Sequence, residues 1–97
     1  MRIIAVRQLK AFWDQHPDAE QPLLAWIDEA RNAAWSNPGQ IKEHYRSASI
    51  LKNRRVVFNI KGNDYRLVVL VRYDKGLLFV KFVGTHSQYD KINVSAV

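Results

Sequence analysis

The stretch RRVVFNIKGNDYRLVVLVRYDKGLLFVKFV, residues 54–83, decides the fold class of this chain. It holds three runs rich in β-branched, aromatic and other apolar residues, Arg54–Lys61, Tyr65–Tyr73 and Leu77–Val83, and turn residues separate them. Runs of this length and composition are typical of β-strands, and the short turns favour consecutive hairpins. The second half of the chain is therefore predicted to form an antiparallel sheet.

The turns between the runs decide which residues face each other. Gly62-Asn63 puts glycine first in a two-residue turn, which favours a type II′ hairpin. That turn sets Asn59 opposite Arg66. In the second hairpin, two- and three-residue loops both fit the sequence. We expect the register that pairs Leu70 with Lys81, because a one-residue slip would bury the lysine.

With these pairings the two faces of the sheet differ in character. One face is entirely apolar and must meet the rest of the protein: Val56, Phe58, Ile60, Leu67, Val69, Val71, Leu78, Val80 and Phe82. The opposite face carries a polar and mostly basic set: Arg55, Asn59, Lys61, Arg66, Arg72 and Lys81. The sequence therefore predicts one buried face and one open, cationic face.

The first half of the chain has helical periodicity after a short strand, Arg2–Val6. Leu9, Phe12 and Trp13 recur at helical spacing, and Pro17 ends that helix. A second helix follows, and its apolar stripe is Leu23, Trp26, Ile27, Ala30 and Ala34. The two helices are expected to cover one face of the sheet.

Local capping signals complete the prediction of the elements. Asp18, with Gln21 three residues later, can cap the second helix. Asn37-Pro38 opens a short helical turn that runs to His44, and residues 46–53 read as a polar connector. Thr85 and Gln88 match a capping box, so a short terminal helix with His86 in its first turn is expected: THSQ, residues 85–88.

Together these elements predict an α+β fold. Two N-terminal helices pack on one face of a twisted antiparallel sheet, and a short helix follows the last strand. The whole of residues 1–97 is expected to form a single domain, because the length suits one hydrophobic core and no linker or repeat interrupts it.

Composition narrows the class of protein and its surroundings. No apolar run approaches the roughly 20 residues that span a bilayer, so no membrane segment is expected. The N-terminal apolar stretch is too short for a secretory signal. The absence of cysteine excludes disulfides and thiolate chemistry. These features fit a cytoplasmic protein.

The positive charge is concentrated in the second half of the chain. Residues 1–48 contain six Lys/Arg and six Asp/Glu, whereas residues 49–97 contain nine Lys/Arg and three Asp/Glu, which accounts for the whole net charge of +6. A lopsided positive field attracts polyanions, of which nucleic acid is the most common. The predicted ligand is therefore RNA or DNA, although basic surfaces also occur without one.

Residues on and beside the cationic face could cleave RNA without a metal ion. That reaction needs a base for the 2′-hydroxyl proton, cations for the charge that develops on the phosphate, and an acid for the leaving oxygen. Arg66 offers a planar fork suited to phosphate, and Lys61 and Lys81 share its predicted face. His86 is the nearby side chain of the type that moves protons at neutral pH, and Tyr89 could stack on a base or contact phosphate.

Each of these residues also has a purely structural reading. Arg66 and Lys81 could be solvated on an open sheet, His86 exposed in a first helical turn, and Tyr89 packed against the sheet. Arg54-Arg55 could be a charged strand entrance, or could touch RNA or an acidic partner. Packing or structural roles are expected for the tryptophans and the remaining histidines: Trp13, Trp26, Trp35, His16 and His44.

Metal and cofactor sites are not expected. The carboxylates beyond residue 48 are Asp64, Asp74 and Asp90, and the first two lie in predicted turns. No cluster of His, Asp and Glu has the spacing of metal ligands. The chain also lacks a glycine-rich phosphate loop and the GxSxG pattern of serine hydrolases.

The run VFNIKGNDYRLVVLVRYDKGLLFVKFVGTHSQYDKI, residues 57–92, resembles the HigB-type toxins of the RelE/ParE superfamily. The motifs that carry the resemblance are Phe58-Asn59-Ile60 with Gly62-Asn63, Tyr65-Arg66-Leu67, Phe82-Val83-Gly84-Thr85-His86 and Tyr89-Asp90-Lys91. The upstream tryptophans Trp26 and Trp35 and the Asn37-Pro38 turn fit the same pattern. The resemblance covers nearly the whole chain.

This resemblance implies a RelE-like fold and cleavage of messenger RNA, usually on the translating 70S ribosome. It also implies neutralisation by a HigA-type helix-turn-helix antitoxin. The catalytic residues it suggests are Arg66 for phosphate stabilisation, His86 for proton transfer and Tyr89 for positioning, with Lys61 and Lys81 as supporting cations. The candidates for RNA binding are Asn59, Lys61, Arg55, Arg72 and Lys91.

Two other functions fit the same sequence. A ParE-like inhibitor of DNA gyrase would use the same fold as a protein-binding toxin and would give His86 no catalytic duty. A non-catalytic RNA-binding module would need only the basic face and would bind RNA with a steep salt dependence. His86 and Tyr89 near Arg66 favour cleavage over both alternatives.

Overall fold

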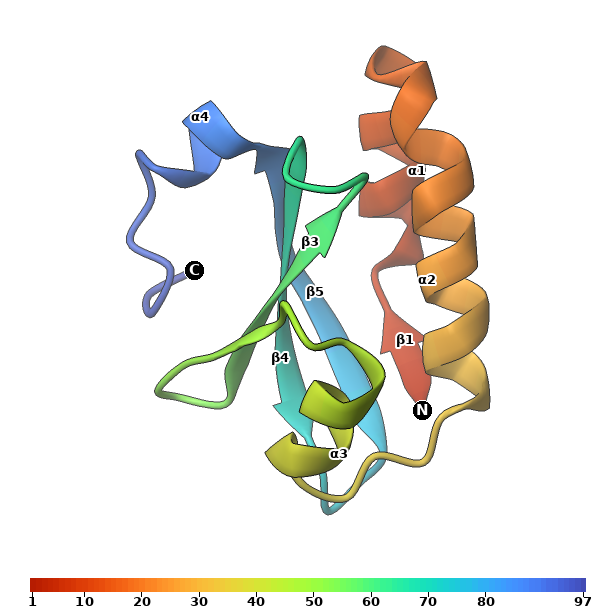
Figure 1. Cartoon of the computed structure of the whole chain (residues 1–97), viewed down its shortest axis with the longest axis vertical. Coiled ribbons are helices and arrows are strands. Elements are labelled where there is room, and N and C mark those ends of the chain that lie inside the picture. The colour runs from red at the N-terminus through yellow and green to blue at the C-terminus, as the bar shows by residue number, and fades with distance from the viewer.

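A five-stranded sheet lies between the N-terminal helices on one side and the C-terminal segment on the other (Figure 1). The computed structural model describes all of residues 1–97. In chain order the elements are β1 (Arg2–Ile4), α1 (Val6–Gln15), a 3-10 turn η1 (Pro17–Ala19), α2 (Glu20–Asn32), α3 (Pro38–His44), β2 (Ser49–Ile50), β3 (Arg55–Ile60), β4 (Tyr65–Arg72), β5 (Leu77–Thr85) and α4 (His86–Tyr89). The predicted α+β class is confirmed.

The sheet is mixed, with the strand order β1-β5-β4-β3-β2. β2 to β5 are joined as antiparallel neighbours, as predicted, but β1 pairs parallel to β5, with Ile3 opposite Leu78. The prediction of a wholly antiparallel sheet was therefore wrong at this edge. The helices and the strands β2 to β4 separate β1 from β5 in the chain, so no hairpin turn joins these two strands and their parallel pairing is possible.

The core forms where the helices meet the predicted apolar face of the sheet. Leu9 of α1 and Leu23 of α2 are fully buried there, and Trp35 and Ile41 extend the core at α3. The sheet contributes Val56, Phe58, Ile60, Tyr65, Leu67, Val69, Val71, Leu78 and Val80. All but one of the predicted face residues are present, because strand alternation keeps them on one side. The exception is Phe82.

The register of the first hairpin is confirmed. Asn59 pairs with Arg66, and the turn closes through the Asp64 backbone N–H, which donates to the Lys61 carbonyl at 3.2 Å. Gly62 has φ +64°, as a type II′ turn requires of its first central residue. Lys61 also has a positive φ of 53°, so the strand alternation ends before it.

The predicted register of the second hairpin was wrong. Leu70 pairs with Phe79 instead of Lys81, because the loop, residues 73–76, is centred between Asp74 and Lys75, one residue earlier than the predicted register requires. A shift of two residues keeps the same side chains facing the core as far as Val80. An irregularity between Val68 and Val69 then leaves Lys81 unpaired, which is a β-bulge. The bulge turns Phe82 to the face opposite the helices.

Three local predictions also need correction. Residues 46–53 are more than a connector, because Ser49–Ile50 pairs with β3 as an edge strand. Ala34 is exposed, since α2 ends at Asn32 before reaching it. α2 has no side-chain cap, so Asp18 does not cap it. The predicted caps at Asn37 and at Thr85 are confirmed.

Asp18 instead fastens the helical layer to the first hairpin. Its carboxylate accepts a hydrogen bond from the Tyr65 hydroxyl and lies 3.0 Å from the Lys61 ammonium. Lys61 also lies 3.1 Å from Asp64. The pKa of Asp18 is lowered, first by the hydrogen bond from Tyr65 and then by the one from Lys61. This cluster therefore favours the ionised carboxylate.

The Asp18 cluster predicts a stability that depends on pH. A carboxyl group whose pKa is lower in the folded state stabilises the fold above its unfolded pKa, and that contribution is lost as the pH falls through the folded pKa. We expect Asp18→Asn to lower the thermal midpoint at pH 7 and to differ less from the parent protein below about pH 4. Circular dichroism melts from pH 2 to 7 measure this. Asp14→Asn, at an exposed position without ion pairs, is the control; equal curves for both variants would contradict the prediction.

No helix of the protein combines the length and the apolar character that crossing a membrane requires.

Candidate functional site

The face of the sheet away from α1 and α2, here called the open face, carries four of the predicted site residues: Arg55, Asn59, Arg66 and Arg72. α4 and the segment after it lie on this side (Figure 1). Strand pairing places these residues on it: Arg55, Val57, Asn59, Arg66, Val68, Leu70, Arg72, Phe79, Phe82 and Gly84. The open face is thus more apolar than predicted, and Val57 and Val68 are buried at its centre.

Arg66 lies at the end of the open face nearest α4. It pairs with Asn59 on one side and with Gly84 on the other. Its Nη1 donates to the Asn63 carbonyl at 2.9 Å, and its guanidinium carbon lies 6.0 Å from the centre of the Tyr89 ring. These contacts hold the guanidinium at the β3–β4 turn, while the side chain stays partly exposed. Arg66 is therefore placed to receive an anion from solvent.

The short helix α4 positions His86 and Tyr89. Thr85 Oγ1 accepts from the Gln88 N–H at 3.1 Å, and Gln88 Oε1 accepts from the Thr85 N–H at 2.9 Å, which is the predicted capping box. The His86 N–H also donates to the Asp64 carbonyl at 3.2 Å and ties the helix to the first hairpin. The start of α4 is thus fixed on both sides.

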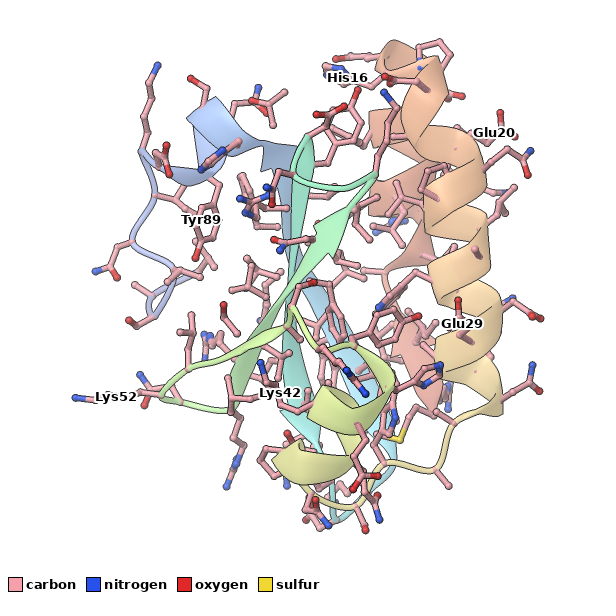
Figure 2. The ribbon with its side chains drawn as sticks, in the orientation of Figure 1. His16, Glu20, Glu29, Lys42, Lys52 and Tyr89 are labelled. Carbon is pink, nitrogen blue, oxygen red and sulfur yellow. The ribbon has the colours of Figure 1, made fainter.

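The phenol and imidazole side chains of α4 have different surroundings. Tyr89 is partly buried and lies over the sheet between α4 and the strands (Figure 2). His86 is exposed, and its Nε2 lies 3.6 Å from the Asp90 carboxylate. The structure therefore brings Arg66 and Tyr89 into contact and places His86 three residues before Tyr89 on the same helix.

Phe82 is a residue of this face that the sequence reasoning placed on the core side. Its ring centre lies 6.5 Å from that of Tyr89. A Cβ atom at Gly84 would come within 2.6 Å of the Phe82 ring and 2.7 Å of Gln88 Oε1, so only glycine leaves room for both. The order Phe-Val-Lys-Phe-Val, residues 79–83, could have indicated the bulge, because Lys81 interrupts the run of apolar residues along this strand.

Two predicted cations do not join the Arg66 group. Lys61 reaches toward the helical layer, where Asp18 and Asp64 neutralise it, because its positive φ turns the chain. Lys81, at the bulge, lines a shallow hollow with Gln8, Ala11, Phe12, Gln15, Phe82 and Val83, beside α1. The predicted register, which set Lys81 opposite Leu70 on the cationic face, is the cause of this error.

The other predicted RNA-binding residues are more scattered. Arg72 contacts Asp74 at 3.4 Å and, through its hydrogen bond, lowers the pKa of that carboxyl. Arg55 lies at the other end of β3 and donates to the carbonyl oxygens of Asn53 and Val97. Lys91 is exposed just after α4.

The structural readings of the remaining aromatic and histidine residues hold. Trp26 and Trp35 are buried, and Trp13 packs partly buried against the core. His16 stacks on the Phe12 ring, and His44 lies 2.8 Å from Glu29. No group of three or more His, Asp or Glu side chains is arranged to hold a metal ion.

The largest hollow is lined by residues between Asp28 and His44 and is acidic, unlike the region around Arg66. It has a volume of about 730 Å³ and lies between α2 and α3. Its lining includes the carboxylates of Asp28, Glu29 and Glu43, which repel phosphate. This hollow is therefore unsuited to a phosphate group.

Comparison with known proteins gives the family. A family model described as HigB_toxin, the RelE-like toxic component of a toxin-antitoxin system, matches residues 19–92. The mRNA interferase toxin HigB of Escherichia coli (strain K12) is 26% identical over 92 residues, which are 93% of this chain and 88% of that protein. The mRNA interferase HigB of Shigella flexneri matches with the same identity and coverage. The chain therefore belongs to the HigB family of RelE-like toxins, each of which is one component of a toxin–antitoxin system.

Proposed function

We propose that this protein is an endoribonuclease that cleaves messenger RNA. The observation that carries the proposal is the group at the end of the open face: the guanidinium of Arg66 over the Tyr89 ring, with His86 exposed on the same short helix. The relatives of similar length named as mRNA interferases support it. The excess of positive charge in the second half of the chain favours a polyanionic substrate.

The proposed reaction is an internal displacement on the RNA chain. The 2′-oxygen forms a bond to phosphorus, the bond to the 5′-oxygen breaks, and the products are a 2′,3′-cyclic phosphate and a 5′-hydroxyl. One proton leaves the 2′-hydroxyl for a base, and another reaches the 5′-oxygen from an acid. His86 carries one of these two transfers.

Arg66 and Tyr89 serve the phosphate and its neighbouring base. The guanidinium of Arg66 is permanently charged and can donate two parallel hydrogen bonds to phosphate oxygens, which stabilises the added charge of the transition state. Tyr89 positions the substrate by stacking or by a hydrogen bond from its hydroxyl. Asn59, beside Arg66 on β3, supplies a further polar contact. Lys81 stays a prediction as a supporting cation.

The setting of the reaction is also part of the proposal. We infer that cleavage takes place on translating ribosomes in the cytoplasm and that a HigA-type helix-turn-helix protein is the antitoxin. No metal ion or organic cofactor has a role in the proposed steps, since Arg66 and His86 supply charge and proton transfer. Purified protein, tested on messenger RNA with and without ribosomes, measures whether the ribosome is required.

The decisive experiment maps the 5′ ends of messages after brief expression of the protein in bacteria. We expect new internal 5′ ends with the parent protein and a loss of at least about 100-fold with His86→Ala, since general acid–base groups contribute about 10²–10⁴-fold. His44→Ala is the matched control, because that histidine pairs with Glu29 away from the open face. It should cleave like the parent protein.

The same experiment separates the alternatives. Intact messages together with DNA damage would favour a ParE-like gyrase inhibitor and contradict cleavage. If the protein bound RNA but produced no new 5′ ends, even with ribosomes present, the non-catalytic RNA-binding module would be favoured. Cleavage at full rate by His86→Ala would remove His86 from the mechanism while keeping the activity.

A further inference from the structure

The turn between β2 and β3 holds an arginine at a position that suits glycine. Asn53 and Arg54 both have positive φ, 59° and 61°, and the Arg55 N–H donates to the Lys52 carbonyl at 3.3 Å. This is the pattern of a type I′ hairpin turn, which prefers Asn followed by Gly. Arginine in this left-handed conformation carries a steric penalty that glycine avoids. The turn therefore holds a guanidinium at residue 54, where its backbone conformation favours glycine.

The same turn borders a basic hollow. Its volume is about 430 Å³, and its lining is Asn53, Arg54, Arg55 and Leu70. No carboxylate lines it, and the guanidinium of Arg54 makes no ion pair or side-chain hydrogen bond, unlike that of Arg72. Leu70 and Arg55 are paired residues of the open face, so the hollow opens on the same side of the sheet as Arg66.

Arg55 presents one edge of its guanidinium with an unfilled donor. Nη1 donates to the Asn53 carbonyl at 2.8 Å, and Nη2 donates to the backbone oxygen of Val97. Nε lies on the same edge as Nη2, is buried, and has no partner. A buried donor without an acceptor is costly. Two oxygens of a phosphate would accept from Nε and Nη2 together, in the parallel arrangement that arginine favours.

We propose that Arg54 and Arg55 form a second phosphate-binding site for the RNA strand, and this rests on the proposed function. A phosphate takes the place of the Val97 oxygen and accepts hydrogen bonds from Nε and Nη2 of Arg55. The positive charge of Arg54 attracts the same phosphate. Arg55 lies four residues along β3 from Asn59, the partner of Arg66, which is about 13 Å. A strand bound at Arg66 therefore reaches this site with phosphates a few nucleotides from the cleaved bond.

Substitution of Arg54 gives the first test, because stability and binding should change in opposite directions. We expect Arg54→Gly to raise the thermal midpoint by about 4 °C by removing the steric penalty. The same variant should bind a single-stranded RNA of twelve nucleotides about 10-fold more weakly at 0.1 M salt. The RNA carries 2′-O-methyl groups throughout, so that cleavage does not enter the measurement by fluorescence anisotropy.

Arg55→Gln tests the second arginine with a charge-matched control. Its affinity for the same RNA should also fall about 10-fold, and the slope of log K against log salt should be reduced by about 0.7 for each phosphate that the variant leaves unneutralised. Lys75→Gln removes one positive charge from another turn of the sheet, outside the hollow, and should bind within two-fold of the parent protein. A dinucleotide is too short to reach both sites and should bind all the proteins equally.

The outcomes distinguish this proposal from the proposed function. If the parent protein binds the RNA and both arginine variants bind it equally well, the second phosphate site is overturned while cleavage at Arg66 stands. If the variants lose affinity for the antitoxin but not for RNA, the two arginines contact an acidic partner and the proposal is again wrong. If the parent protein binds no RNA, the proposed function fails first.

Discussion

Arg66→Ala is expected to lower kcat for RNA cleavage by about 10²–10³-fold, the loss seen when one group that stabilises a transition-state charge is removed. Arg66 contacts the Tyr89 ring, and its Nη1 bonds to the Asn63 carbonyl, so the charge is held in place before the substrate binds. With alanine at position 66, only water stabilises the charge that develops on the phosphate in the transition state. Because the contact with phosphate is strongest in the transition state, KM should change less than kcat.

Two further variants define what the loss means. Arg66→Lys keeps the charge but not the planar fork, and we expect it to recover only part of the rate. Arg7→Ala removes an exposed arginine from α1, on the helical side, and should leave kcat unchanged. Single-turnover cleavage of a message on stalled ribosomes measures all three. A rate for Arg66→Ala within three-fold of the parent protein would exclude Arg66 from the chemistry.

Phe58→Ala is expected to lower the free energy of unfolding by about 3–5 kcal/mol, the range for removing a buried aromatic ring. Phe58 is 1% exposed, and its ring centre lies 5.3 Å from that of Trp26 and 5.1 Å from that of Tyr45. The ring of Trp35 stacks on it at 6.2 Å. One residue of β3 thus contacts α2 and the residues that follow α2 and α3, and its loss opens a cavity among them.

The expected loss is large relative to the stability of a domain, which is commonly about 5–15 kcal/mol. Urea unfolding followed by tryptophan fluorescence measures it, since two tryptophans contact the ring. Phe58→Leu keeps most of the apolar volume and should cost less than about 1.5 kcal/mol. Equal losses for the two variants would contradict this prediction, because the apolar volume that leucine keeps would then restore no stability.

Much of the fold could be predicted from short stretches of sequence. The first hairpin formed as expected because Gly62 and Asn63 suit only a few turn conformations and so fix the pairing of Asn59 with Arg66. Asn37 and Thr85 cap their helices through bonds to residues three positions later, a purely local matter. The candidate site followed in part: Arg66, His86 and Tyr89 lie at one end of the open face.

The rest depended on contacts between distant parts of the chain. Asp18 has good local reasons to cap α2, but the Tyr65 hydroxyl, 47 positions away, binds it instead. Arg55 was a candidate for RNA binding, and its guanidinium donates to the backbone oxygen of Val97, 42 positions away. The residues next to Asp18 and Arg55 in the sequence do not indicate these hydrogen bonds, because the partners come close only after the chain has folded.

The sequence by itself determined the element types apart from the edge strand β2, the apolar face from Val56 to Val80, the first register and the concentration of positive charge, since propensity and alternation act over a few residues. Only the tertiary structure decided the second register, the bulge at Lys81 and the position of Phe82. Registers that differ by two residues bury the same side chains and so have nearly equal local energies. Packing against α1 and β1 distinguishes them, and no short window of sequence contains those contacts.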